Sequence, residues 1–212
     1  MIDLYSWQTP NGRKVSIMLE EIGMDYNVFP INIGKDEQFQ PHFLEISPNN
    51  RIPAIIDRDN NNYSLFESGA ILMYLAAKSG KLINKSNTDE YYRTIEWLMW
   101  QMGGVGPMFG QVHHFVKYNK GKSAYAEERY SKEARRLYGV MDKRLSENPY
   151  IAGKEYSIAD ISIWPWTARF DWLEIDLNEF PNVTRWYKEM IDRPAVQKGW
   201  LVPQNDQLIP SP

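Results

Sequence analysis

The stretch that decides the fold is Ser47-Pro48-Asn49-Asn50-Arg51-Ile52-Pro53-Ala54-Ile55. It opens with residues typical of a turn and continues into an apolar strand, predicted over residues 52–57. Pro53 stands at the start of that strand, where its missing amide is tolerated, as it is on an edge strand. Alternatively, a cis bond between Ile52 and Pro53 would present the neighbouring backbone to a ligand. Position alone leaves both interpretations open.

Short strand and helix patterns flank this stretch on both sides. Alternating apolar residues predict strands, and apolar residues at i, i+3, i+4 and i+7 predict helices packed on one face. The predicted order is β-α-β-α-β-β-α, with the last two strands joined by an Asn-rich turn and paired antiparallel. The segments are strands over 2–4, 26–31, 52–57 and 63–66, and helices over 15–22, within 34–45 and over 67–78.

The remainder of the chain is predicted to be helical. A long helix over 91–116 should bend near Gly103-Gly104-Val105-Gly106-Pro107, because glycine and proline weaken the helix interior. Ser157 and Asp160 form a capping-box pattern that starts a further helix. The other predicted helices cover residues 124–145 and 181–192. We therefore expect an α/β domain over residues 1–80 and an all-helical domain over residues 88–212.

Composition excludes several classes of protein. The 212 residues carry a net charge of -3, so no basic excess is available for nucleic acid. Mean hydropathy is -0.53, and no apolar run suggests a membrane span. The N-terminus opens directly on an apolar alternation, from which we expect a cytoplasmic protein. The chain has no cysteine, so any thiol chemistry must bring its own sulfur.

Two patterns resemble known functional motifs, a phosphate-binding loop and a metal site, but lack features that those motifs require. Gly121-Lys122-Ser123 resembles the end of a phosphate-binding loop, but the earlier glycine is missing and no strand precedes it. His113 and His114 are adjacent, so on a helix they point about 100° apart and cannot share one metal ion. The sequence therefore predicts no metal site.

Two helix starts remain as candidate binding sites. Glu67 and Ser68 stand where a strand runs into a helix, and free N–H groups there, with the serine hydroxyl, could hold a carboxylate. Ser68 could equally be an N-cap without a ligand. Glu67 could take an ammonium group, so the pair suits an α-amino acid. Thr9-Pro10-Asn11 begins the first helix, where a thiolate would gain from the helix dipole, although a purely structural start is equally consistent.

Taken together, these features resemble the glutathione transferases over essentially the whole chain, most closely the bacterial Nu class. The resemblance implies a thioredoxin-like N-terminal domain with a mixed four-stranded sheet, followed by a C-terminal helical bundle. The residues that carry it are Thr9–Gly12, Gln38-Phe39, Ile46–Ile55, Leu65–Ile71, Gly103–Met108 and the Ser157-x-x-Asp160 capping box.

The resemblance also implies roles for individual residues. Ile52, before a cis Pro53, would pair with the cysteinyl part of glutathione, and Glu67 and Ser68 would hold the γ-glutamyl amine and carboxylate. Thr9 and Asn11 would lie near the sulfur. Gln38 and Arg51 would sit near the glycyl end, and Arg129 of the Glu-Arg-Tyr segment would also reach glutathione.

One departure from the wider superfamily affects the expected chemistry. Many classes activate the thiol with a tyrosine, serine or cysteine just after the first strand, whereas here Thr9 and Asn11 are favoured over Ser6. The expected activity is glutathione-dependent disulfide reduction in a homodimer, without a protein cysteine and without a metal. Conjugation of glutathione to electrophiles and a non-catalytic glutathione-binding regulatory module are the alternatives.

Overall fold

The computed structural model describes residues 1–204 and 206–212 and separates into two compact units. The first comprises Met1–Lys81 and Asp192–Ile209, and the second comprises Leu82–Ile191 and Pro210–Pro212. The sequence predicts that all of residues 88–212 belong to the helical domain, whereas the structure places Asp192–Ile209 in the first unit. This segment joins the first unit because it contains α9 (Pro194–Trp200), which packs against α1 (Pro10–Ile22).

The contact between α1 and α9 is close and specific. A Cβ on Gly199 would lie 2.6 Å from the Cα of Ile17, so only glycine allows the two backbones to approach. Ser16 Oγ donates a hydrogen bond of 2.6 Å to the Gly199 carbonyl. The Arg13 guanidinium lies 3.4 Å from the centroid of the Trp200 ring, a cation–π contact.

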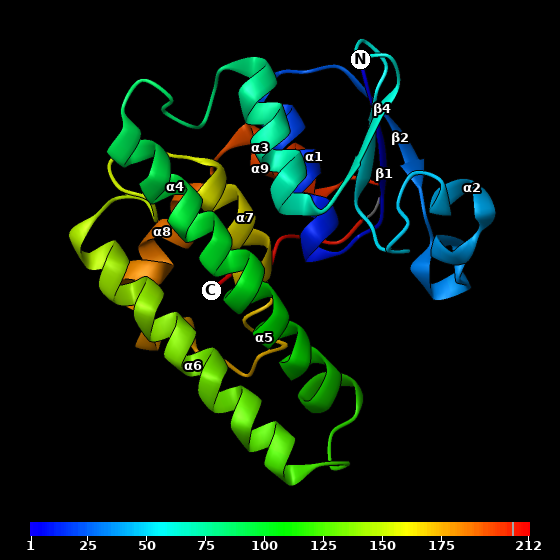
Figure 1. Cartoon of the computed structure of the whole chain (residues 1–212). Coiled ribbons are helices and arrows are strands. Elements are labelled where there is room, and N and C mark those ends of the chain that lie inside the picture. The colour runs from blue at the N-terminus through cyan, green and yellow to red at the C-terminus, as the bar shows by residue number, and fades with distance from the viewer. Residues whose placement is uncertain (205) are drawn as a thin grey trace. The chain divides into compact units, whose positions relative to one another are not determined.

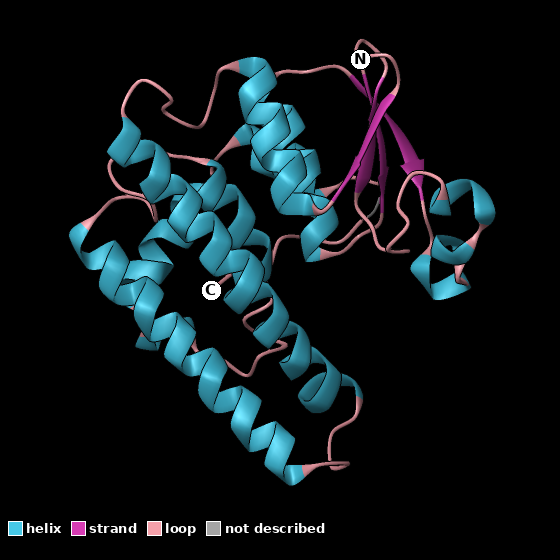
Figure 2. Ribbon diagram, viewed as in Figure 1, coloured by secondary structure: helices cyan, strands magenta, loops and turns pink. Residues whose placement is uncertain are grey.

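The first unit contains the predicted four-stranded mixed sheet, drawn in magenta in Figure 2. Its strands are ordered β2-β1-β3-β4, with β1 parallel to β2, and β3 antiparallel to both β1 and β4. Their bounds are β1 (Ile2–Ser6), β2 (Tyr26–Pro30), β3 (Ala54–Asp57) and β4 (Tyr63–Phe66).

The two faces of this sheet bury different side chains because residues alternate along a strand. Tyr5 and Ala54 pair across β1 and β3 and pack with Ile31 and Phe43. Leu4 and its partner Ile55, on the other face, are fully buried. Figure 1 shows α1 and α3 on one side of the sheet and α2 on the other. The helical segments here are α1, η1 (Ile33–Lys35), η2 (Glu37–Phe39), α2 (Pro41–Leu44) and α3 (Ser68–Ser79).

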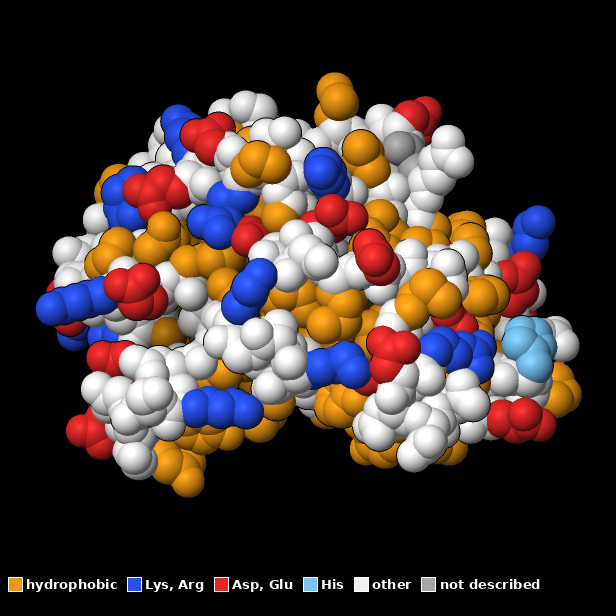
Figure 3. Space-filling model, turned by 90° about the horizontal axis from the view of Figure 1, so that it is seen from above, with side chains coloured by type: hydrophobic (Ala, Val, Ile, Leu, Met, Phe, Trp, Pro, Cys, Tyr) orange, Lys and Arg blue, Asp and Glu red, His pale blue; other side chains and the backbone are white. Residues whose placement is uncertain are grey.

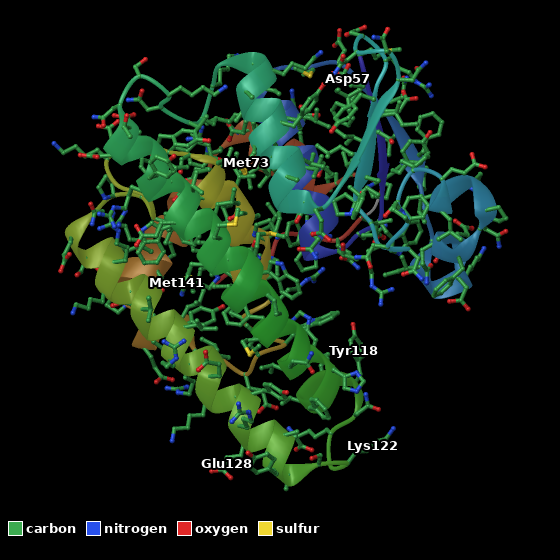
Figure 4. All side chains as sticks on the ribbon, in the orientation of Figure 1. Asp57, Met73, Tyr118, Lys122, Glu128 and Met141 are labelled. Carbon is green, nitrogen blue, oxygen red and sulfur yellow. The ribbon has the colours of Figure 1, made fainter. Side chains whose placement is uncertain are left out.

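The second unit is helical throughout its regular structure. The predicted bent helix is observed as α4 (Thr88–Trp100) and α5 (Gly106–Val112), joined and followed by the π-helical segments η3 (Gln101–Val105) and η4 (His113–Tyr118). Figure 4 labels Glu128 and Met141 within α6, Tyr118 at the end of η4, and Lys122 in the connection between them. The remaining elements are α6 (Ala124–Glu147), α7 (Ile158–Thr167), η5 (Leu177–Glu179) and α8 (Pro181–Ile191).

The start of α7 is a complete capping box, as the sequence predicts. Ser157 accepts from the amide of Ala159, and Asp160 accepts from the amide of Ser157 at 3.0 Å. Asp160 is fully buried and also accepts from the Ile151 amide at 2.9 Å and from Trp186 Nε1 at 3.0 Å. Burial raises the pKa of Asp160 to about 6, and these hydrogen bonds act in the opposite direction.

Within the described residues, no helix combines the length and apolar character needed to cross a bilayer. Lys and Arg side chains are interspersed with Asp and Glu over the face drawn in Figure 3.

Candidate functional site

Sheet topology brings three of the predicted features to one end of the sheet. Tyr5 pairs with Ala54, and Ala54 pairs with Phe66. The end of β1, the beginning of β3 and the end of β4 are therefore neighbours. The segments attached at these points are residues 7–12, Ile52-Pro53 and Glu67-Ser68, so three separate parts of the chain converge here because of the strand order.

The turn before β3 is built to present Ile52 and Pro53. Ser47 is fully buried, and its hydroxyl donates to the Arg51 carbonyl at 2.8 Å. Asn50 adopts the left-handed region with φ 48°, which asparagine tolerates better than most residues. The Ile52–Pro53 bond is cis. The sequence left two interpretations of Pro53 open, and a cis bond is the geometry of the one in which the neighbouring backbone faces a ligand.

The start of α1 is held tightly against the loop that follows β1. Thr9 is the N-cap, and its hydroxyl accepts from the Gly12 amide at 3.2 Å. A Cβ on Gly12 would lie 2.3 Å from the Trp7 carbonyl oxygen and 2.4 Å from Ser6 Oγ, so glycine is required. Ser6 is fully buried, whereas Thr9 and Asn11 are half-buried. A ligand sulfur could therefore approach Thr9 or Asn11 more readily than Ser6.

The start of α3 lacks a side-chain cap. Glu67 occupies the N-cap position with φ 71° and ψ 111°, a strained conformation for a residue with a Cβ. Its side chain makes no capping hydrogen bond and is exposed. Ser68, the first helical residue, is buried, with 3% of its surface exposed. The start of α3 thus places the first N–H groups of a helix beside the Glu67 carboxylate, an arrangement that can bind an anion next to a cation.

Lys14, which the sequence reasoning missed, lies under this helix start. It is fully buried, and its Nζ donates to Ser68 Oγ at 3.2 Å. Burial lowers the pKa of Lys14 to about 7, while the charge of Glu67 acts to raise it. A signal was present, because Lys14 stands four residues before Met18 on the apolar face of α1.

Gln38 and Arg51, predicted near the glycyl end, differ in their surroundings. Gln38 is buried, and its Oε1 has no hydrogen-bond partner among the described residues. Its Nε2 lies 3.4 Å from Asp36 Oδ1. Such a buried, unsatisfied amide oxygen is uncommon and is consistent with a ligand contact. Arg51 is exposed, and its Nη1 donates to the Asn50 carbonyl at 3.4 Å.

Arg129 belongs to the second unit. It is exposed on α6 next to Glu128, which Figure 4 labels, and it lines a hollow of about 570 Å³. Tyr125, Tyr130 and Met108 also line this hollow, so its wall combines cationic and aromatic groups. Strand pairing therefore brings together Thr9, Asn11, Ile52-Pro53 and Glu67-Ser68 of the first unit, whereas Arg129 belongs to the second unit.

The two adjacent histidines lie in different surroundings. His113 is buried and stacks on Trp166 with ring centroids 5.5 Å apart, and it meets Trp172 edge-on at 5.1 Å. Burial, and then the charges of Arg169 and Lys117, lower its pKa to about 4. His114 instead lies against Phe115. Among the residues described, no three His, Asp or Glu side chains are grouped to hold a metal ion.

The fold and the sheet end define a class of protein. A β-α-β-α-β-β-α unit with a cis-proline opening the third strand is thioredoxin-like, and here a helical unit follows it. Comparisons with known proteins specify the family. The model for the glutathione S-transferase N-terminal domain matches residues 1–77, and that for the C-terminal domain matches residues 104–194. The chain belongs to the glutathione S-transferase family.

Individual relatives are similar over nearly their whole length. The disulfide-bond oxidoreductase YfcG of Escherichia coli is 47% identical over 208 residues, covering 96% of each chain. A glutathione transferase family member from Pseudomonas fluorescens, solved with two glutathione molecules bound, is 46% identical with a TM-score of 0.90, covering 95% of this chain and 93% of that one. A Pseudomonas putida glutathione transferase, solved with one glutathione disulfide per subunit, is 43% identical with a TM-score of 0.88, covering 95% and 91%.

Proposed function

We propose that this protein is a glutathione-dependent disulfide reductase that uses no cysteine of its own. The observation that carries the proposal is the convergence of Thr9, Asn11, Ile52-Pro53 and Glu67-Ser68 at one end of the sheet, in a chain without cysteine. The similarity to YfcG, named as a disulfide-bond oxidoreductase, favours reduction over conjugation. The relatives solved with two glutathione molecules or with glutathione disulfide support the same choice.

In the proposed complex, glutathione is held along its length. The α-carboxylate of its γ-glutamyl group binds Ser68 and the first N–H groups of α3, and the α-ammonium binds Glu67. The backbone of Ile52 pairs with the cysteinyl residue. Gln38 and Arg51 bind near the glycyl end, and the buried unpartnered oxygen of Gln38 supports this assignment. Arg129 provides a further contact from α6.

The proposed reaction is two successive thiol–disulfide exchanges. A glutathione thiolate attacks one sulfur of the substrate disulfide, giving a mixed disulfide and releasing one substrate thiolate, which takes up a proton. A second glutathione thiolate then attacks the glutathione sulfur of the mixed disulfide. Glutathione disulfide forms, and the second substrate thiolate leaves and is protonated. Both electrons come from glutathione, so the protein supplies binding and orientation.

Thr9 and Asn11 are the proposed donors to the reacting sulfur. Thr9 Oγ1 already accepts from the Gly12 amide, so its own O–H is oriented to donate. Donation to a thiolate at a helix start favours the ionised form, and about 1.4 kcal/mol of preference lowers a thiol pKa by one unit. One or two such hydrogen bonds are sufficient for this shift.

A direct comparison of two reactions tests the proposal. The protein should reduce hydroxyethyl disulfide with glutathione far faster than it conjugates glutathione to an aryl halide. Asn11→Ala should lower the reductase kcat about tenfold or more while changing stability by about 1 kcal/mol or less. Asn60→Ala, in the turn at the opposite end of the sheet, is the matched control and should leave turnover unchanged. Full activity of Asn11→Ala would refute its role at the sulfur.

The same proposal includes a cytoplasmic homodimer with a small disulfide as second substrate. Light scattering at micromolar concentration should give twice the mass of one chain, 24.9 kDa. A mass equal to one chain would remove the dimer from the proposal without affecting the chemistry.

A further inference from the structure

The two proposed sulfur donors stand in a short stretch that the end of the chain contacts on both sides. Thr9 and Asn11 lie between Gln8 and Arg13, and each of these flanking residues donates a hydrogen bond to the segment that follows α9. The described part of this segment that belongs to the first unit covers residues 201–204 and 206–209. Figure 1 shows α9 beside α1, so the segment leaves its helix close to the site.

The contacts differ in strength on the two sides. Gln8 Nε2 donates to the Gln204 carbonyl at 3.3 Å. Arg13 is fully buried, and its Nη2 donates to Gln207 Oε1 at 3.1 Å. Its Nε donates to the Trp200 carbonyl at 3.3 Å, and Trp200 Nε1 donates to the Gln207 carbonyl at 2.9 Å. Gln207 is therefore held through both its side chain and its backbone, and it links Arg13 to the end of α9.

The segment makes these contacts without regular structure of its own. Residues 206–212 form neither helix nor strand, and a chain end of this kind frays unless other contacts tie it down. Gln207 is exposed, so its side chain adds little to the hydrophobic core. What it does supply is an acceptor for a buried guanidinium, and hydrogen bonds to charged groups are among the stronger ones. The contact thus orients the start of α1 more than it adds to the core.

Orientation of this helix start matters for the proposed chemistry. Thr9 and Asn11 belong to the same first turn, so a shift of that turn moves both proposed donors together. A donor stabilises a thiolate only at hydrogen-bond distance and with good alignment. A displacement of about 1 Å in a catalytic group can lower a rate by as much as about 100-fold. Arg13 follows Asn11 by two residues, so its anchoring bears directly on where the donors lie.

We propose that Gln207 is a positioning residue that holds the start of α1 through Arg13, so that Thr9 and Asn11 face the sulfur of glutathione. The proposal rests on the function proposed above and adds a residue from the far end of the chain to it. Gln207 acts through Arg13 and not on the reacting atoms. Loss of its side-chain acceptor should let the helix start shift and weaken donation to the thiolate.

The test measures the pKa of the glutathione thiol in the complex, from the ultraviolet absorbance of the thiolate, together with the kinetics of hydroxyethyl disulfide reduction. In the wild-type protein, the bound thiol should have a pKa about one unit or more below that of free glutathione. Gln207→Met keeps the length of the side chain and removes the acceptor. It should raise the pKa of the bound thiol by about half a unit and lower kcat about threefold, with KM for the disulfide within about twofold of wild type.

Three further variants accompany this one. Gln207→Glu keeps an oxygen acceptor at the same reach and should retain the wild-type thiol pKa and kcat. Asp206→Met, the matched control, removes the neighbouring exposed polar side chain and should change neither value. Gln8→Met removes the donor to the Gln204 carbonyl and should act in the same direction as Gln207→Met. It replaces Gln207→Met if that variant does not fold.

The outcomes separate the two levels of the proposal. A Gln207→Met protein that is less stable but keeps the wild-type thiol pKa and kcat would indicate a merely structural role and overturn the inference. An equal effect of Asp206→Met, or a Gln207→Glu protein as impaired as Gln207→Met, would overturn it as well. A wild-type protein that binds glutathione without lowering the pKa of its thiol would instead overturn the proposed donors, and this inference with them.

Discussion

Helices α3 and α7 both have a serine and an acidic residue at their starts, yet their first turns are built differently. At α7, Ser157 and Asp160 satisfy each other and the neighbouring backbone in a buried capping box. At α3, Glu67 makes no capping bond, its backbone lies at φ 71°, and Ser68 rests on a buried lysine. The α7 start is therefore closed by its own side chains, whereas the N-cap residue of α3 makes no capping hydrogen bond and lies in a strained conformation, as residues at binding sites often do.

The largest expected effect is a loss of stability when the acceptor at the start of α7 is removed. Asp160→Ala would leave the buried N–H groups of Ile151, Ser157 and Trp186 without their acceptor. We expect a loss of about 3 to 5 kcal/mol in the free energy of unfolding, measured with urea, and no change in the glutathione affinity of the folded fraction.

Asp176→Ala is the matched control for that loss. Asp176 is exposed and caps only the short segment η5 through the Asn178 amide. Its removal should cost about 1 kcal/mol or less. An Asp160→Ala variant as stable as this control would contradict the claim that the capping box at the start of α7 contributes strongly to the stability of the fold.

The pH dependence of stability should distinguish the α3 start through Lys14. Burial, opposed by the charge of Glu67, gives Lys14 a pKa of about 7 in the folded protein, against an ordinary value of 10.5. Between these values the unfolded chain binds one more proton, so the contribution to stability grows as pH rises and is lost as pH falls toward 7. From pH 7 to 9, the unfolding free energy of wild type minus that of Lys14→Met should rise by about 2 kcal/mol. A difference independent of pH would show that Lys14 does not titrate in this range.

The smallest effect should be a gain in stability at Glu67. Glu67→Gly relieves the strain of a positive φ, worth about 1 to 3 kcal/mol, against a cost of about 0.5 to 1 kcal/mol for added chain freedom. We expect thermal unfolding to show a net gain of about 1 kcal/mol, together with about a tenfold loss of glutathione affinity. Glu67→Ala, which keeps the strain, should show the same loss of affinity without the gain. A stabilised Glu67→Gly with unchanged affinity would remove Glu67 from the site.

The sequence predicts the sheet well because its strands are short, alternate cleanly and are separated by turn residues. The specific run from Ser47 to Pro53 also indicates a cis bond before Pro53 as one interpretation, and the structure contains this bond. The same holds for the capping box at Ser157, because its pattern is local.

Contacts between distant segments were not predictable in the same way. The segment around α9 joins the first unit because Gly199 meets Ile17, and nothing near either residue signals the other. The burial of Lys14 was not predicted, because lysine side chains are usually exposed to solvent. Its position on the apolar face of α1 is the one local sign of burial. The π-helical turns around α5 likewise depend on how the helix packs, and the glycines indicate only an irregularity.

The stoichiometry of disulfide reduction tests the central claim most directly. With glutathione in excess, we expect the cysteine-free protein to form one glutathione disulfide for each hydroxyethyl disulfide consumed, at a rate well above that of glutathione alone. A rate equal to the uncatalysed reaction at saturating glutathione would contradict the claim that this sheet end supports disulfide reduction with the ligand's sulfur alone.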